Sequence, residues 1–290
     1  MALYALDGDR FIFAGEAEEK KIYRCAGCSA QVKVRRGPFR VPHYYHQRKS
    51  PSCRLYSKSE DHMLAQLSIQ ALLPRGEALI EQPLVEVNRV ADVLWKPRKI
   101  VFEIQCSFLT PHEAKQRVLD YAQAGYQVVW ILDDRLYNRR KLRPAESLVR
   151  TFPSYYATLR KQTTPIFYDQ FEIFDENRRL MKGQRLRIDL DSPQIITYPD
   201  WETDNLPQQI VNKSLPGTLY FEGDLIFYAL LSKTTPTYFH AMLNLKSLEI
   251  QWKQKTKKEN SLIRKIILHC VLEPFGLLMI WLLDRAAETN

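Results

Sequence analysis

Apolar and polar positions alternate most regularly in the middle of the chain, where they predict a compact run of helices and strands. Leucines at helical spacing after Ser59 predict a helix over residues 59–73. A capping box and a glycine stop predict a second helix over 110–125. Segments rich in branched and aromatic residues predict strands over 78–87, 89–95, 100–106 and 127–132. The predicted order is helix, three strands, helix, strand.

Polar side chains interrupt the otherwise apolar segment 100–106. Glu103 and Gln105 are two residues apart, so on a strand they point to the same face. A hairpin with its turn at 96–99 places Asp92 directly opposite Glu103. Two half-buried carboxylates so close repel each other unless they share a proton or a cation. We therefore predict a divalent ion, Mg²⁺ or Mn²⁺, between Asp92 and Glu103.

Two further residues extend this acidic pair. Gln105 is suited to orient an attacking water or the scissile phosphate, and Glu60 adds a third acidic group at the start of the first predicted helix. In the competing interpretation, Asp92 and Glu103 are rim residues that each form a salt bridge with an arginine or a lysine.

The roles of three more side chains each have two interpretations. His62 is either a member of the acidic site or a structural histidine. Arg117 and Tyr121, four residues apart on the predicted helix 110–125, either line the path of a phosphate or form an ordinary solvated face.

Positive charge is concentrated near the N-terminus. The chain has a formal net charge of +9, and the segment from Lys20 to Lys58 contains eleven lysines and arginines but no acidic residue. Such a field favours a polyanion, with nucleic acid first and an anionic membrane surface second. Aromatic residues lie among these charges, so the segment is suited both to neutralise phosphates and to stack on bases. The predicted DNA-binding residues are Arg35, Arg36, Arg40, Arg48 and Lys49, with Arg117 farther along the chain.

The same basic segment carries metal-ligating residues at close spacing, in the order Cys25-x2-Cys28-x14-His43-x2-His46. Two thiolates and two imidazoles suit tetrahedral Zn²⁺, and the alternating stretch between the pairs predicts a hairpin that brings them together. Since the two histidines are closer than is usual, Cys53 is an alternative to one of them. The competing interpretation is a surface pair of cysteines without metal.

The site spacing, Asp92-x10-Glu103-x-Gln105, resembles the PD-(D/E)xK nuclease superfamily, although Gln105 stands where a lysine is usual. With the upstream cysteines and histidines, the chain resembles the competence protein CoiA family over about residues 20–135, in the ordered motifs "YRCAGC", "VPHYYH", "SKSEDH", "RVADVLW" and "FEIQCS". The resemblance implies a restriction-endonuclease-like αβββαβ core in an α/β protein, preceded by a small zinc-binding β segment.

Carried over by position, the resemblance places the family's acidic site on Glu60, Asp92, Glu103 and Gln105, with His62 nearby. The chain departs from the expected pattern at Lys58, where a glutamate is expected. This departure leaves two roles open for Glu60, as a ligand or as a carboxylate that interacts with the helix dipole.

The predicted domains are a basic zinc-binding domain (1–57), a nuclease-like domain (58–140) and a mixed, helix-rich accessory domain (141–290). In the last, 164–190 predicts a strand meander, and 217–232 and 261–283 predict helices. Residues 266–283 predict either peripheral membrane contact or a buried helix. The first residues lack the pattern of a secretory signal, so we expect a cytoplasmic protein that is either free or membrane-associated through its C-terminal region.

Two functions remain in competition at this stage. The first is a metal-dependent DNA nuclease in bacterial natural transformation, with structural zinc and catalytic magnesium or manganese. The second is a non-catalytic recombination or competence factor that binds DNA with the same fold. Both predict DNA as a partner, including single-stranded DNA, and both allow contact with recombination or uptake proteins.

Overall fold

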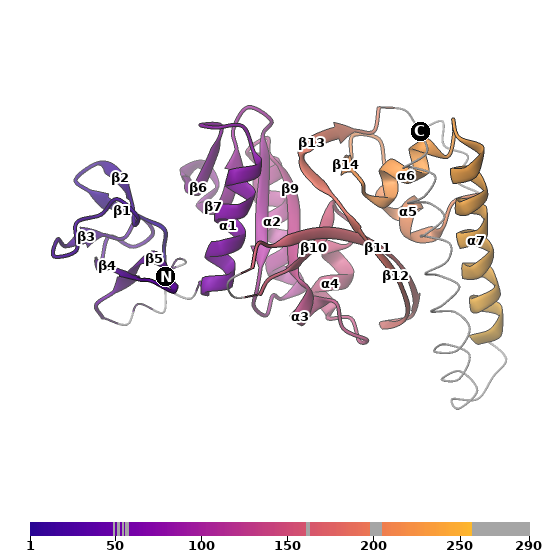
Figure 1. Cartoon of the computed structure of the whole chain (residues 1–290), viewed down its shortest axis with the longest axis horizontal. Helices are drawn as coiled ribbons and strands as arrows, with labels where there is room; N and C mark the ends of the chain where they lie inside the picture. Colours follow the sequence, from indigo (N-terminus) through magenta and orange to yellow (C-terminus); the bar gives the residue numbers. More distant parts are fainter. Residues whose placement is uncertain are drawn as a thin grey trace. The chain divides into compact units, whose positions relative to one another are not determined.

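The computed structural model describes residues 1–48, 50, 53, 55, 58–160, 163–197 and 205–256 of the 290-residue chain. These residues form two compact units. The first comprises 1–136 with 157–166, and the second comprises 137–156 with the residues from 167 onward. Figure 1 colours both units by their position in the sequence.

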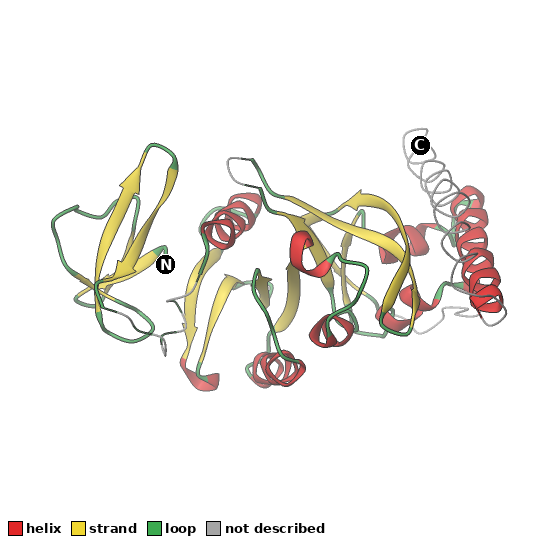
Figure 2. Ribbon diagram, turned by 90° about the horizontal axis from the view of Figure 1, so that it is seen from below, coloured by secondary structure: helices red, strands yellow, loops and turns green. Residues whose placement is uncertain are grey.

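The first unit begins with a small five-stranded sheet in the order β2-β1-β3-β4-β5. Its interior is small: Ala5, Tyr23, Val32 and Tyr44 are among its buried residues. The predicted hairpin is confirmed, with β4 paired antiparallel to β5. Figure 2 shows these strands as a group without helices. The strands are β1 (Tyr4–Asp7), β2 (Arg10–Phe13), β3 (Tyr23–Arg24), β4 (Gln31–Gly37) and β5 (Arg40–His46).

The rest of the first unit follows the predicted order of helix, three strands, helix and strand. Its strands lie in the order β9-β8-β7-β6, with β8 parallel to β9, so β6 and its Pro83 occupy an edge of the described sheet. The elements are α1 (Glu60–Leu72), β6 (Ala78–Leu84), the short 3-10 helix η1 (Val85–Val87), β7 (Arg89–Trp95), β8 (Ile100–Gln105), α2 (Pro111–Gln123), β9 (Gln127–Asp133) and α3 (Asp134–Tyr137).

Capping explains where the two long helices of this unit begin. The side chain of Ser59 accepts a hydrogen bond from His62 N at the start of α1, and Thr110 accepts one from Glu113 N at the start of α2. Pro111 occupies the first turn of α2, where its missing N–H costs nothing. These caps are the ones that the sequence predicts.

The second unit is built from strands as well as helices. Strands β12, β11 and β10 are neighbours, β13 pairs with β14, and a large apolar cluster includes Phe171, Ile210 and Trp252. The elements are α4 (Pro144–Val149), β10 (Ser154–Thr158), β11 (Ile166–Asp175), β12 (Arg178–Arg187), β13 (Asp189–Ile195), α5 (Gln208–Lys213), β14 (Leu219–Glu222), α6 (Leu225–Leu231) and α7 (Pro236–Thr256).

One helix prediction in this unit is wrong in part. The apolar stretch 217–232 contains strand β14 followed by helix α6, not one helix. Gly223 adopts a left-handed φ of 83°, and Asp224 caps α6 by accepting a hydrogen bond from Phe227 N. The predicted helix over 261–283, with the membrane contact at 266–283, lies outside the described residues. Among the residues that are described, no helix combines the length and apolarity needed to cross a membrane.

Candidate functional site

Three acidic residues stand side by side on neighbouring strands of the first unit. The pairs Val93–Phe102 and Trp95–Ile100 give the predicted register of β7 and β8, which puts Asp92 across from Glu103. The pairs Ile80–Val93 and Gln82–Ala91 put Glu81 of β6 across from Asp92 on the other side. All three side chains are buried. Glu81 is not among the site residues predicted from the sequence, although the pairing of β6 with β7 brings it opposite Asp92.

Asp92 is surrounded by donors. Lys58 Nζ lies 2.6 Å and His62 Nε2 lies 3.0 Å from Oδ1, while Ile104 N donates to Oδ2 at 3.0 Å. Burial alone would raise the pKa of Asp92, but its interactions with His62 and Lys58 outweigh burial and hold the pKa well below its usual range. The Asp92 carboxylate is therefore ionised and compensated.

Lys58 joins two of the acidic residues. Its ammonium lies 2.6 Å from Asp92 Oδ1 and 3.4 Å from Glu81 Oε1, and its side chain is only 9% exposed. Burial lowers the pKa of Lys58, yet the charges of Asp92 and Glu81 more than offset this and keep the pKa above its ordinary value. The other oxygen of Glu81 accepts hydrogen bonds from the backbone N–H groups of Leu3 and Tyr4.

Glu103 is held by helix α2. Tyr121 donates its hydroxyl to Oε1, and Arg117 forms an ion pair with Oε2. Burial raises the pKa of Glu103, and the neighbouring Arg117 only partly offsets that rise. Burial and the charge of Glu103 also raise the pKa of the Tyr121 hydroxyl. The interpretation of Arg117 and Tyr121 as an ordinary solvated face does not hold, because Tyr121 is buried and both side chains bind Glu103.

A cavity of about 370 Å³ opens beside these residues. The predicted site residues that line it are His62, Asp92, Gln105, Arg117 and Tyr121, and Lys58, Ser59 and Arg89 line it as well. Gln105 donates its amide to the backbone oxygen and the hydroxyl of Ser107. Of the four residues predicted for the acidic site, Asp92 and Gln105 therefore line this cavity, whereas Glu60 and Glu103 do not.

Glu60 does not belong to this group. Its Oε1 accepts a hydrogen bond at 3.1 Å from Val41 N, at the start of β5. The reason is geometric, because Glu60 and His62 are two residues apart on α1 and so project in different directions. Because Glu60 lies outside the acidic group, its position favours the role of a carboxylate that interacts with the dipole of α1. Its contact with Val41 also ties the start of α1 to the N-terminal sheet.

The donor set around Asp92 and Glu103 does not fit a divalent cation. Each of their four carboxylate oxygens already accepts a hydrogen bond from a donor of the chain, and two of those donors, Lys58 and Arg117, are cations. A bound Mg²⁺ would need these oxygens and would be repelled by both cations. Among the described residues, Glu60, Asp92 and Glu103 do not converge into a metal-binding group.

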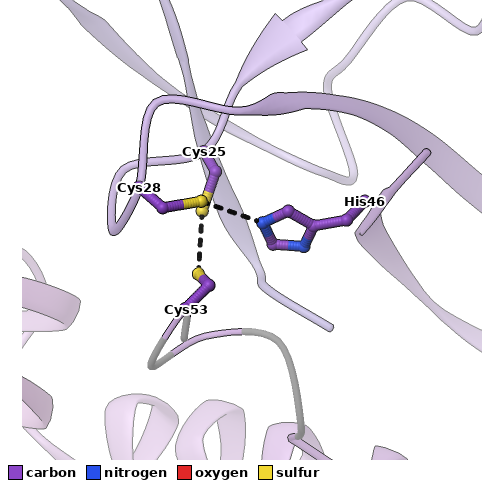
Figure 3. Close-up of side chains that lie close together, drawn as sticks. All are labelled: Cys25, Cys28, His46 and Cys53. Carbon is purple, nitrogen blue, oxygen red and sulfur yellow. Dashed lines mark hydrogen bonds between the residues drawn. The ribbon is translucent and has the colours of Figure 1, made fainter. Parts of the chain in front are cut away.

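A second site lies in the N-terminal sheet and is formed by Cys25, Cys28, His46 and Cys53, as Figure 3 shows. Their ligand atoms all lie within 4.8 Å of one another, with Cys28 Sγ 3.3 Å from His46 Nε2 and Cys25 Sγ 3.5 Å from Cys53 Sγ. Three sulfurs and one imidazole at this separation fit a tetrahedral ion such as Zn²⁺. Burial raises the pKa of the Cys25 thiol to about 12, so metal binding there must displace a proton.

The structure corrects one member of the predicted ligand set. His43 lies outside the cluster, where its Nδ1 donates to Val41 O at 2.8 Å, and Cys53 takes its place. His43 and His46 are three residues apart on strand β5, and side chains three apart point to opposite faces of a strand. The alternative ligand that the sequence offered, Cys53, is the one brought to the cluster.

The predicted DNA-binding arginines Arg35, Arg36, Arg40 and Arg48 are exposed, whereas Lys49 lies outside the described residues. The aromatic residues of the segment divide into two groups. Tyr23 and Tyr44 are buried in the core of the sheet, while Tyr45 is partly exposed and Phe39 is 83% exposed. Stacking on bases is therefore open to only some of them.

Comparison with protein families gave two matches. Residues 14–56 match the N-terminal domain of competence protein CoiA, and residues 58–173 match its nuclease-like domain. The first match contains all four members of the cysteine–histidine cluster, and the second contains the three neighbouring acidic residues and Lys58. Comparisons with curated proteins and with solved structures gave no match.

Proposed function

Because this chain belongs to the competence protein CoiA family, we propose that it is a DNA-binding factor of natural transformation that retains the nuclease-like fold without metal-dependent cleavage. The observation that supports this proposal best is the position of Lys58. Its ammonium lies between two carboxylates in the place where a nuclease needs a divalent cation.

Lys58 replaces a metal in charge but not in chemistry. An ammonium beside Asp92 compensates the buried negative charge, as a cation must if the carboxylate is to stay ionised. It has no open coordination position for water, so it cannot generate the metal-bound hydroxide that attacks a phosphodiester. Arg117 has the same effect at Glu103. The neighbouring buried carboxylates Glu81, Asp92 and Glu103, which we call the acidic row, are thus hydrogen-bonded, and their charge is compensated within the core.

DNA binding in this proposal is the task of the basic N-terminal segment. Exposed arginines from a stretch without acidic residues neutralise phosphates and release counterions, which gives affinity that falls steeply with salt. The cysteine–histidine cluster, loaded with zinc, stabilises this small sheet, whose apolar core is limited.

A second candidate function is metal-dependent DNA cleavage. The observation in its favour is that Asp92, Glu103 and Gln105 share one face, and that Asp92 and Gln105 line a cavity open to a substrate. This function requires that Lys58 and Arg117 leave the carboxylates when DNA and metal bind.

One experiment separates the two. Labelled single-stranded and duplex DNA are incubated with Mg²⁺ or Mn²⁺ and the wild-type protein, Asp92→Asn or Glu103→Gln, and binding and cleavage are both measured. We expect binding that weakens with salt and no cleavage by any of the three. Cleavage that both substitutions abolish would overturn the proposal in favour of the nuclease, and the absence of binding to every DNA would overturn both.

A further inference from the structure

The hairpin of β4 and β5 ends in an exposed aromatic residue. Gly37 pairs with Arg40, so the turn consists of Pro38 and Phe39. Phe39 is 83% exposed, which leaves both faces of its ring accessible. A phenylalanine at a turn contributes nothing to the small core of this sheet, because the buried residues of that core lie elsewhere.

Arginines flank this tip in the sequence, and the guanidinium of Arg36 also donates to Ala17 O. Arg35 and Arg36 precede the turn, Arg40 follows it, and all three are exposed. Arg35 places its guanidinium 4.5 Å from the centre of the Tyr45 ring, so one arginine and one aromatic ring already stack on the side of the hairpin. No acidic residue occurs between Lys20 and Lys58 to compensate this charge locally.

The hairpin is braced at several points below its tip. Tyr44 and Ala2 exchange backbone hydrogen bonds, and His46 at the end of β5 belongs to the cysteine–histidine cluster. Near the turn, Val41 N donates to Glu60 at the start of α1. A tip held in this way presents its ring without a large loss of conformational entropy on binding.

We infer that this tip, Gly37 to Arg40, is a contact site for the unpaired bases of single-stranded DNA. Phe39 stacks on a base, and Arg35, Arg36 and Arg40 neutralise the flanking phosphates. Stacking requires a free base face, which a single strand offers and an intact duplex hides. The inference rests on the DNA binding proposed above. It adds that the preferred DNA is single-stranded and that the hairpin tip selects it.

The test compares Phe39→Ala with Phe11→Ala, a control that removes a half-exposed phenylalanine from another hairpin of the same sheet. Binding to labelled oligothymidylate and to a duplex of equal length is measured by fluorescence anisotropy at fixed salt. We expect Phe39→Ala to weaken single-strand binding about 10-fold while duplex binding stays unchanged. We expect Phe11→Ala to bind like the wild type and Phe39→Trp to retain single-strand affinity, because every base can stack on an indole.

Other outcomes separate this inference from the proposed function. If the wild type binds no DNA, the proposed function fails. If the wild type binds and Phe39→Ala binds both forms equally well, or loses both equally, the hairpin inference fails while DNA binding stands. Anionic phospholipid vesicles form a third arm, and loss of vesicle binding in Phe39→Ala with no effect on oligothymidylate would assign the tip to a lipid surface and overturn the inference.

Discussion

The ammonium of Lys58 lies 2.6 Å from Oδ1 of Asp92, a buried carboxylate that has the buried Glu81 and Glu103 on its neighbouring strands. The sequence motif predicts a glutamate at position 58. In the structure, the buried carboxylates beside this position need a nearby cation, which Lys58 supplies. Removal of either partner leaves an uncompensated buried charge, which costs far more than the loss of a surface ion pair.

Replacement of Lys58 by methionine tests this dependence. Methionine fills similar space but leaves Asp92 and Glu81 without their shared cation, so we expect a loss of about 3–5 kcal/mol in the free energy of unfolding at neutral pH. Urea denaturation followed by circular dichroism measures it. The control is Lys96→Met, which removes an exposed lysine from the nearby turn and should change stability by less than about 0.5 kcal/mol. Equal stability of the two variants would contradict the proposed role of Lys58.

Lys58→Glu should convert the compensated pocket into a site for a divalent cation. The substitution removes the ammonium and adds a third carboxylate beside Asp92 and Glu81, a set of hard oxygen ligands that suits Mg²⁺ or Mn²⁺. We expect this variant to be unstable alone and to gain stability when Mn²⁺ is added, whereas the wild type and Lys58→Met show no such gain. Thermal denaturation with and without Mn²⁺ measures the effect, and an equal response of all three proteins would argue against it.

The acidic row also shows how far sequence reasoning reaches. Alternation along 100–106 and the length of one turn were enough to place Asp92 opposite Glu103, because strand register follows from local rules. The donors that neutralise them were not predictable in the same way. Lys58 comes from the residues just before α1, His62 from α1, and Arg117 and Tyr121 from α2. Their positions therefore depend on how the two helices pack against the sheet.

The cysteine–histidine cluster illustrates the same limit. Spacing identified Cys25 and Cys28, but the choice among His43, His46 and Cys53 depended on whether residues 43–46 form a strand or a turn. On a strand, only one of the two histidines can face the sulfurs. Cys53, the third cysteine, belongs to no helix or strand, so no periodicity in the sequence predicts its orientation.

Metal content distinguishes the observed ligand set of three cysteines and His46 from the predicted set of two cysteines and two histidines. We expect one zinc per chain in the wild-type protein and in His43→Asn, whose amide can still donate to Val41 O, and a substoichiometric amount in Cys53→Ala. Elemental analysis of protein purified without chelator gives the answer. Chelation should also unfold the N-terminal sheet, since its core is small. Retention of zinc by Cys53→Ala together with its loss from His43→Asn would favour the set of two cysteines and two histidines.

Asp224 in the second unit predicts a dependence of stability on pH that is unrelated to DNA. Burial and the nearby charge of Asp169 raise its pKa to about 6, despite hydrogen bonds from Phe221 N, Phe227 N and the Tyr155 hydroxyl. Since the folded pKa lies above the ordinary value of 3.8, folding favours the protonated form. Its contribution to stability is therefore complete below about pH 4 and is lost as the pH rises through 6.

Asp224→Asn isolates this contribution, because asparagine keeps an oxygen for the helix cap and does not titrate. The variant loses some hydrogen bonds at every pH, so the quantity of interest is how the difference in unfolding free energy between wild type and variant changes with pH. We expect the wild type to lose about 3 kcal/mol relative to Asp224→Asn between pH 4 and pH 7, which follows from a shift of about two pKa units. Urea denaturation at several pH values measures the difference. A difference that stays constant across this range would mean that the pKa of Asp224 in the folded protein equals its ordinary value of 3.8, so that the three donors around it fully offset its burial.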